Sequence, residues 1–372
     1  MLAIMHQLVQ PHGTGSLSNM ILLEFIDTLI EAEGPRIQHP EDAIFSGAGV
    51  ARQALDALKD VIDNPGSVSI KWDGGVALFF GNKDGKFVMT DKYMPNKGVY
   101  PDSPQGWREY DQARGADRGN LYQQVETIWP GLKAAVGNTE GLFKGDLMWV
   151  GELQPVKGAY VFKPTTVEYR VPANSDMGKL IDGKVGGIVV HSFNGSPWDG
   201  KTGISNSVSD VLVLAPKAGI EFSLKSPVRL IAAAEKAVST DGPKAEEFLN
   251  GMPGVVRAAI QTYMNKQITG QTKDKIQDWL ATKLSGKQQT AMLDPENGYL
   301  FTNADGLNAL YSVWNSINNL KVHLAQQLEQ QVKGFEQWTG GKREGEGFVF
   351  NSKMGLLKIV NRAGFGGAHF NK

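Results

Sequence analysis

Hydrophobic residues recur at three- and four-residue intervals in two parts of the chain, and this spacing predicts helices. The first part covers residues 17–63. The second covers residues 222–340, where an apolar stripe runs from Leu307 to Leu328. The stripe predicts one long amphipathic helix that packs in a core.

Between these parts, short β-type runs are separated by Gly, Asn and Asp turns. Residues 76–80 and 87–90 flank the turn-rich segment from Gly81 to Gly85, which predicts an antiparallel hairpin. The second strand of this hairpin can also be placed at 86–89, and the other expected strands are 67–70, 145–150, 187–191, 347–350 and 355–360.

This order of elements predicts an α+β fold. We expect residues 1–66 to be a helical segment that packs on a catalytic domain built from residues 67–221 and 341–372. Residues 222–340 are expected to be a helical insertion or accessory domain. Within 226–340, eleven Lys and Arg residues balance eleven Asp and Glu residues, so composition does not predict a basic clamp.

The amino-acid composition excludes several kinds of functional site. Lys and Arg number 38 against 39 for Asp and Glu, so no global positive field points to nucleic acid. The absence of cysteine excludes disulfides and thiol nucleophiles, and the six scattered histidines argue against an imidazole metal centre. No run has the roughly 18 apolar residues of a membrane span, and no export signal is recognised. We expect a cytoplasmic protein that is not bound to membranes.

Residues 67–80 carry the clearest chemical signal. Lys71 directly follows the expected strand 67–70. Asp73 and the glycines Gly74 and Gly75 come next, and a second strand then begins. A lysine held in a partly dry pocket loses some of its charged form and can act as an amine nucleophile. The glycines would allow a phosphate or ribose to approach the backbone closely.

Lys71, Asp73 and Gly74 resemble the Lys-x-Asp-Gly motif of the covalent nucleotidyltransferases, the superfamily of ATP-dependent DNA ligases, RNA ligases and mRNA capping enzymes. The resemblance implies that Lys71 attacks the α-phosphate of ATP and becomes lysyl-AMP, with Asp73 orienting the nucleotide or the lysine. Val76 stands where many members have Arg, and Lys92 is a candidate for the missing contact.

Two later segments resemble the motifs that contact the nucleoside. In residues 143–149, Asp146 takes the place of an acidic residue near the ribose, and Glu152 is a rival for this role. In residues 187–193, either His191 or Phe193 could stack on the purine.

Two segments near the C-terminus resemble the motifs that hold metal and phosphate. Glu346 would bind the catalytic divalent ion, with Glu344 as an alternative or second ligand. Lys358 would bind the α-phosphate. Val360 occupies the position of a second lysine, for which Lys353 or Arg362 could compensate.

The resemblance therefore implies an antiparallel-sheet nucleotidyltransferase domain of the ATP-grasp-like, ligase adenylylation type. It implies ATP as cofactor with Mg²⁺ or Mn²⁺, and nucleic-acid ends as partners. Few residues follow Arg362, so a C-terminal OB domain is not expected. The whole pattern also resembles uncharacterised ligase-like proteins of large tailed phages, which implies a host cytoplasmic location.

The implied activity is a polynucleotide ligase that seals 5′-phosphate to 3′-hydroxyl ends, with RNA favoured over DNA by analogy of fold. Two alternatives stay open. One is a nucleotide- or nucleic-acid-binding protein that lost turnover, and the other is an adenylyltransferase with a different acceptor.

Overall fold

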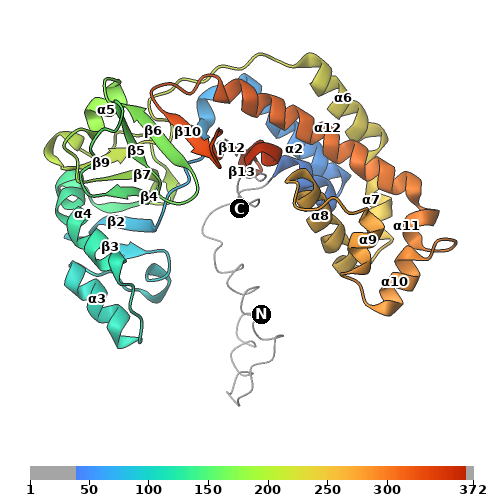
Figure 1. Cartoon of the computed structure of the whole chain (residues 1–372), viewed down its shortest axis with the longest axis horizontal. Coiled ribbons are helices and arrows are strands. Elements are labelled where there is room, and N and C mark those ends of the chain that lie inside the picture. The colour runs from blue at the N-terminus through green and yellow to red at the C-terminus, as the bar shows by residue number, and fades with distance from the viewer. Residues whose placement is uncertain (1–38, 366–372) are drawn as a thin grey trace. The chain divides into compact units, whose positions relative to one another are not determined.

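The computed structural model describes residues 39–365 and contains both helices and strands (Figure 1). The helix expected before residue 39 lies outside the described residues. The 3₁₀-helices are η2 (Pro40–Ser46), η3 (Pro65–Ser67), η4 (Pro95–Lys97) and η5 (Asn206–Val208). The α-helices are α2 (Ala48–Asp63), α3 (Pro104–Ala113), α4 (Asn120–Val136), α5 (Asp176–Ile181), α6 (Val228–Thr240), α7 (Gly242–Asn250), α8 (Gly254–Ile268), α9 (Ile276–Ala281), α10 (Gly286–Leu293), α11 (Tyr299–Thr302) and α12 (Ala304–Glu329).

The strands of the described residues form three sheets. The first has the order β1-β12-β13, the second β11-β10-β6-β5 and the third β3-β2-β4-β7-β8, with β9 added parallel to β7. Their bounds are β1 (Val68–Ile70), β2 (Ala77–Lys83), β3 (Lys86–Asp91), β4 (Gly141–Val150), β5 (Ala159–Phe162), β6 (Glu168–Pro172), β7 (Gly186–Phe193), β8 (Ser196–Pro197), β9 (Val211–Leu214), β10 (Glu336–Thr339), β11 (Lys342–Arg343), β12 (Phe348–Ser352) and β13 (Gly355–Ile359).

The hairpin of β2 and β3 confirms the antiparallel pairing expected from sequence. Its turn is tighter than expected, because β2 continues to Lys83 and only Asp84 and Gly85 lie between the strands. Both residues have positive φ, 55° and 74°, the backbone conformation that a two-residue hairpin turn of matching twist requires.

The six-stranded sheet has one face covered by helices. Phe80 and Phe143 stack at 5.6 Å on this face, and Trp107 of α3 and Trp129 of α4 belong to the same buried cluster. Alternation along each strand places the next residue on the opposite face. Asp146, between Gly145 and Leu147 of β4, therefore lies on the face away from this cluster.

The three-stranded sheet joins distant parts of the chain. Residues 68–70 of β1 pair with residues 348–350 of β12, which in turn forms a hairpin with β13. Ile70, Phe348 and Phe350 are buried in a core that also includes α2, α12 and the second sheet. Burial of one face fixes the register, since a one-residue slip would turn these side chains toward water.

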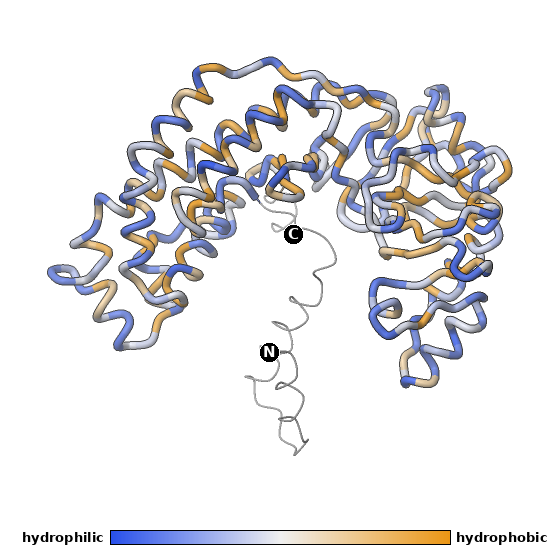
Figure 2. Tube along the Cα trace, turned by 180° about the vertical axis from the view of Figure 1, so that it is seen from behind, coloured by the Kyte–Doolittle hydropathy of each residue, from blue (hydrophilic) through white to orange (hydrophobic). Residues whose placement is uncertain are grey.

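The helices of the insertion lie between β9 and β10. The expected long helix is present as α12, whose stripe includes the fully buried Leu310, Val313 and Leu324. Hydrophobic and hydrophilic positions alternate at short intervals along these helices (Figure 2). No helix among the described residues is both long and apolar enough to span a membrane.

Strand structure returns earlier than the expected boundary at residue 341. Residues 336–338 of β10 pair with residues 168–170 of β6 in the second sheet. This part of the expected insertion therefore belongs to a sheet that also contains β5 and β6. The architecture is α+β with mainly antiparallel sheets.

A group of buried charged side chains connects η2, α12 and the segment that follows β13. Lys321 of α12 and Glu41 of η2 form an ion pair in which neither side chain is exposed. Arg362, which follows β13, donates to Glu41 at 3.0 Å and pairs with Asp42 at 3.3 Å. Burial opposes the ionisation of Glu41, but the neighbouring cations outweigh it and lower the pKa of Glu41 to about 2.

Lys321→Met should lower the free energy of unfolding by roughly 3–5 kcal/mol, because Glu41 would keep a buried charge without its lysine. Urea unfolding measures this loss. The exposed Lys236 of α6 provides the control, and Lys236→Met should change stability by less than about 0.5 kcal/mol. Equal stability of the two variants would contradict the assigned role of the pair.

The neighbouring His39 should make stability depend on pH. Burial lowers the pKa of His39 to about 3, although Glu41 opposes this shift. The unfolded chain binds a proton near pH 6.5 and the folded chain does not, so His39 costs stability as pH falls below 6.5. Relative to His39→Gln, the wild type should lose about 2 kcal/mol between pH 7 and pH 5 in urea unfolding. Parallel profiles of the two proteins would exclude this effect.

Candidate functional site

Lys71 and Glu346 meet at the end of the three-stranded sheet. Lys71 directly follows β1 and Glu346 precedes β12, and their side chains form an ion pair. The backbone N–H of Lys71 donates to the carbonyl of Gly347 at 2.8 Å, which extends the pairing of the two strands. The side chains are 20% and 17% exposed, so a ligand from solvent could reach both.

The surroundings of Glu346 hold its pKa above the ordinary value of a glutamate. Burial raises the pKa of Glu346, while the charges of Lys71 and Lys358 oppose the rise. Lys358 lies on β13 opposite Val349, on the half-exposed face of the sheet. Two cations therefore flank one partly buried carboxylate.

Asp73 is held by backbone groups. Its Oδ2 accepts from the N–H groups of Thr166 and Val167 at 2.7 and 2.8 Å. Its own N–H donates to the hydroxyl of Tyr169 at 2.7 Å. These contacts anchor the turn after Lys71 to the segment before β6. The role of Asp73 in orienting the nucleotide or the lysine stays a prediction.

Trp72 reinforces this anchor from inside the core. Its indole N–H donates to the carbonyl of Pro216 at 3.0 Å. The ring stacks on Tyr169 at 5.2 Å and on Phe335 at 5.0 Å. Sequence reasoning missed Trp72, Tyr169 and Phe335. No local pattern in the sequence indicates that these three rings meet.

Asp146 lies against the glycine turn. A Cβ on Gly74 would overlap the Cβ of Asp146, and the N–H of Gly75 donates to the carbonyl of Leu147 at 2.8 Å. The rival Glu152 is exposed beyond the end of β4 and accepts from Gln154 at 3.1 Å. Asp146 is therefore the acidic residue that the fold brings to the Lys71 turn.

A β-bulge in β7 separates the two aromatic candidates. Lys144 pairs with Ser192 and Gly145 with Val190, which leaves His191 as the extra residue. His191 Nε2 lies 2.8 Å from Asp146 Oδ2, on the face away from the helices. Phe193 stacks on Phe143 at 4.4 Å in the helix-covered cluster. Phe193 therefore packs against the helix-covered cluster, whereas His191 is the aromatic side chain beside Asp146. Which of the two stacks on the purine stays a prediction.

Lys353 and Arg362 were expected to compensate for the lack of a lysine at position 360, but the structure gives each of them a different position or partner. Arg362 is 12% exposed and pairs with Glu41 and Asp42, so its charge is already compensated. Lys353 follows β12 in the hairpin turn, at the opposite end of the hairpin from Glu346. Val360 itself is buried.

Two candidate residues from the sequence remain, Glu344 and Lys92, and each lies in its own part of the structure. Glu344 Oε1 accepts from Asn361 at 3.3 Å and its carboxylate lies against Gly364, so it is turned to the C-terminal segment. Lys92 is exposed directly after β3, and its ammonium lies 4.9 Å from the Tyr93 ring centre.

One protein-family model matches the chain, and its description names no activity. A model described as a family of unknown function (DUF6267) matches residues 36–372. The chain belongs to DUF6267. No curated protein and no solved structure matches it.

Metal binding in this DUF6267 chain would depend on one carboxylate. Residues 39–365 contain no group of three or more Asp, Glu or His side chains arranged to hold an ion. Mg²⁺ in nucleotide sites often has one or two carboxylate ligands and completes its shell with phosphate oxygens and water. Glu346 fits that pattern, and Glu344 does not converge with it.

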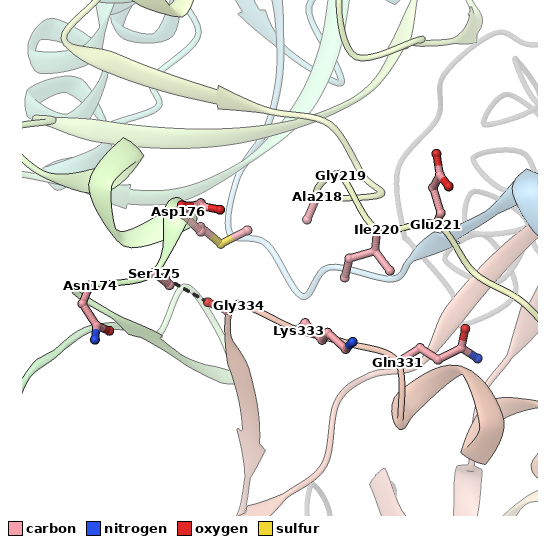
Figure 3. A pocket seen from close by; sticks show the side chains of 11 residues that line it. Asn174, Ser175, Asp176, Ala218, Gly219, Ile220, Glu221, Gln331, Lys333 and Gly334 are labelled. Atoms are coloured by element: carbon pink, nitrogen blue, oxygen red, sulfur yellow. Dashed lines mark hydrogen bonds between the residues drawn. The ribbon is translucent and has the colours of Figure 1, made fainter.

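An open pocket of about 640 Å³ lies apart from these residues. Its lining includes Ser175 and Asp176 at the start of α5, Glu221, and Lys333 after α12. Figure 3 shows the bond from the Ser175 hydroxyl to the carbonyl of Gly334, 3.4 Å long, at its edge. None of the lining residues belongs to the Lys71 site, and no buried polar group converges on the pocket.

Gly74→Ala should displace Asp146 and lower stability by roughly 1–3 kcal/mol, because the added methyl group overlaps its side chain. Urea unfolding measures the loss. Gly49→Ala in α2 is the control, since nothing lies within 4 Å of its added Cβ. That change should be neutral or stabilising by up to about 1 kcal/mol. Equal effects of the two substitutions would contradict the close packing at Gly74.

Proposed function

We propose that this protein is an ATP-dependent nucleotidyltransferase in which Lys71 becomes covalently bonded to AMP. The observation that carries the proposal is the convergence of four separate segments on the segment from Lys71 to Gly75. Pairing of β1, β12 and β13 brings in Glu346 and Lys358. The contact of Gly74 with Asp146, and that of Asp146 with His191, bring in the other two.

The proposed reaction joins nitrogen to phosphorus. The ammonium of Lys71 first loses a proton, for which Glu346 is the adjacent acceptor. Because burial raises the pKa of Glu346, this carboxylate is a stronger base than an exposed one. The Nζ lone pair then forms a bond to the α-phosphorus of ATP while the bond to the bridging oxygen breaks. Pyrophosphate leaves with that electron pair, and the nitrogen releases its second proton to solvent.

The remaining side chains bind and orient the nucleotide in this proposal. Lys358 offers a positive charge to the α-phosphate, where negative charge develops during transfer. Asp146 and His191 offer a hydrogen-bond acceptor and a planar ring to the nucleoside. Once Glu346 has passed that proton to solvent, its carboxylate would hold Mg²⁺ or Mn²⁺ with phosphate oxygens, and that ion would neutralise charge on the departing pyrophosphate.

We further propose that the AMP passes to a 5′-phosphate end and that a 3′-hydroxyl then displaces it, which seals a polynucleotide. RNA is the preferred substrate in this proposal, by analogy of fold. The host cytoplasm is the proposed location.

A nucleotide-binding protein without turnover is the second candidate. It is favoured by the buried Val360 and by the pairing of Arg362 with Glu41 and Asp42, because neither position offers the α-phosphate a second cation. Binding of ATP without transfer would follow if Lys358 alone stabilises the transition state too weakly.

Incubation with α-³²P-ATP and Mg²⁺ should label the wild-type protein, and the label should survive denaturing electrophoresis. Lys71→Arg should abolish it, because arginine can keep the ion pair with Glu346 but is not a nucleophile at neutral pH. The exposed Lys133 supplies the control, and Lys133→Arg should be labelled like the wild type. Protein is first treated with pyrophosphate to remove bound AMP. An unlabelled wild type that still binds ATP would favour the binding protein.

Glu346→Gln should slow label formation by about 10²-fold or more, because the amide is neither a base nor a ligand comparable to a carboxylate. The rate is measured by quenching the reaction over time at saturating ATP. Glu344→Gln is the matched control and should stay within a few-fold of the wild type, since Glu344 faces Asn361. A larger loss with Glu344→Gln than with Glu346→Gln would reverse the assignment.

A further inference from the structure

The helical insertion is neutral in total but its charges are separated. Residues 254–290 contain only two acidic residues, Asp274 and Asp278. The same stretch has six basic residues, which are Arg257, Lys266, Lys273, Lys275, Lys283 and Lys287. The acidic residues that balance them are elsewhere in the insertion, for example Glu235, Glu246 and Glu247 on α6 and α7.

The basic residues lie on consecutive helices that pack together. Helices α8, α9 and α10 carry them or flank them, and Figure 1 shows these helices side by side. Arg257 and Lys266 are partly exposed and the four other lysines are exposed. Within residues 39–365, none of the six forms an ion pair with a carboxylate, whereas Glu235 of α6 pairs with Lys59 at 2.8 Å.

Two of these lysines converge on one aromatic ring. The ammonium groups of Lys266 and Lys283 lie 5.1 and 4.8 Å from the centre of the Trp279 ring. Trp279 is half-buried against the core, so the ring holds both cations at the surface. The cation–π contacts offset part of the repulsion between like charges, and a polyanion would offset the rest.

We propose that α8, α9 and α10 form a contact surface for the phosphate backbone of a polynucleotide. This inference rests on the proposed function, because it supplies a place to hold the strand whose end is sealed. Unpaired lysines on a surface suit regularly spaced phosphates, which dominate the affinity of nucleic acids for proteins. An acidic protein partner is less suitable, because Val255 is the only large apolar side chain exposed on these helices.

The test compares two fourfold variants of the full chain. The first is Lys273→Gln, Lys275→Gln, Lys283→Gln and Lys287→Gln. The matched control changes four other exposed lysines, Lys133, Lys201, Lys236 and Lys244, to Gln. Both variants lose the same net charge, and thermal unfolding checks that both are folded. Fluorescence anisotropy measures the binding of fluorescein-labelled single-stranded RNA and DNA at several KCl concentrations.

The first variant should bind RNA at least about 10-fold more weakly near 0.1 M KCl, and its plot of log affinity against log salt should be less steep by roughly 2. The control variant should remain within about twofold of the wild type. The proposal would be overturned if the first variant bound RNA as tightly as the wild type. It would also be overturned if the control variant lost as much affinity as the first variant. Competition by polyglutamate as effective as that by RNA of equal charge would also overturn it and indicate an acidic protein partner.

Labelling of Lys71 in the same proteins separates this inference from the proposed function. If no protein is labelled but the first variant alone loses RNA binding, the surface stands and the nucleotidyltransferase proposal fails. If labelling occurs and RNA binding is unchanged in the first variant, the surface is wrong and nucleotidyl transfer stands.

Discussion

Antiparallel pairing of β1 with β12 is the constraint on which the candidate site depends, because it joins residues 275 positions apart in an ion pair. The pairing is stabilised by burial of Ile70, Phe348 and Phe350, and that burial also sets its register. The β12–β13 hairpin then places Lys358 on the same sheet. Loss of this register would separate Lys71 from Glu346 and Lys358 together.

The two ion-paired groups differ in what they can do. Lys71 and Glu346 are partly exposed, so water or a nucleotide can replace one partner at modest cost. Glu41 and Lys321 are fully buried, and neither can be separated from the other without leaving an uncompensated charge. The buried pair, with Arg362, is thus suited to hold η2, α12 and the end of β13 together, while the partly exposed pair can be reached by a ligand from solvent.

Polar anchoring around Asp73 connects the site to the second sheet. Its carboxylate accepts two backbone N–H groups, and the neighbouring Trp72 stacks on Tyr169 and on Phe335. These contacts fix the backbone from Trp72 to Gly74, so the position of Lys71 is set by packing on both sides of the turn. Charge separation within the helical insertion is independent of these contacts and concerns a different surface.

The sequence by itself determined the helix α12, the β2–β3 hairpin and the order of the residues with reactive side chains, because periodicity and turn chemistry are local properties. Only the tertiary structure decided that His191 lies beside Asp146 while the partly buried Phe193 packs against the helix-covered cluster, since a single bulge reverses the faces of β7. It also decided that Arg362 pairs with Glu41 and that Asp73 anchors a turn. Those partners are tens to hundreds of residues away, and no local pattern records contacts that form only when the chain folds.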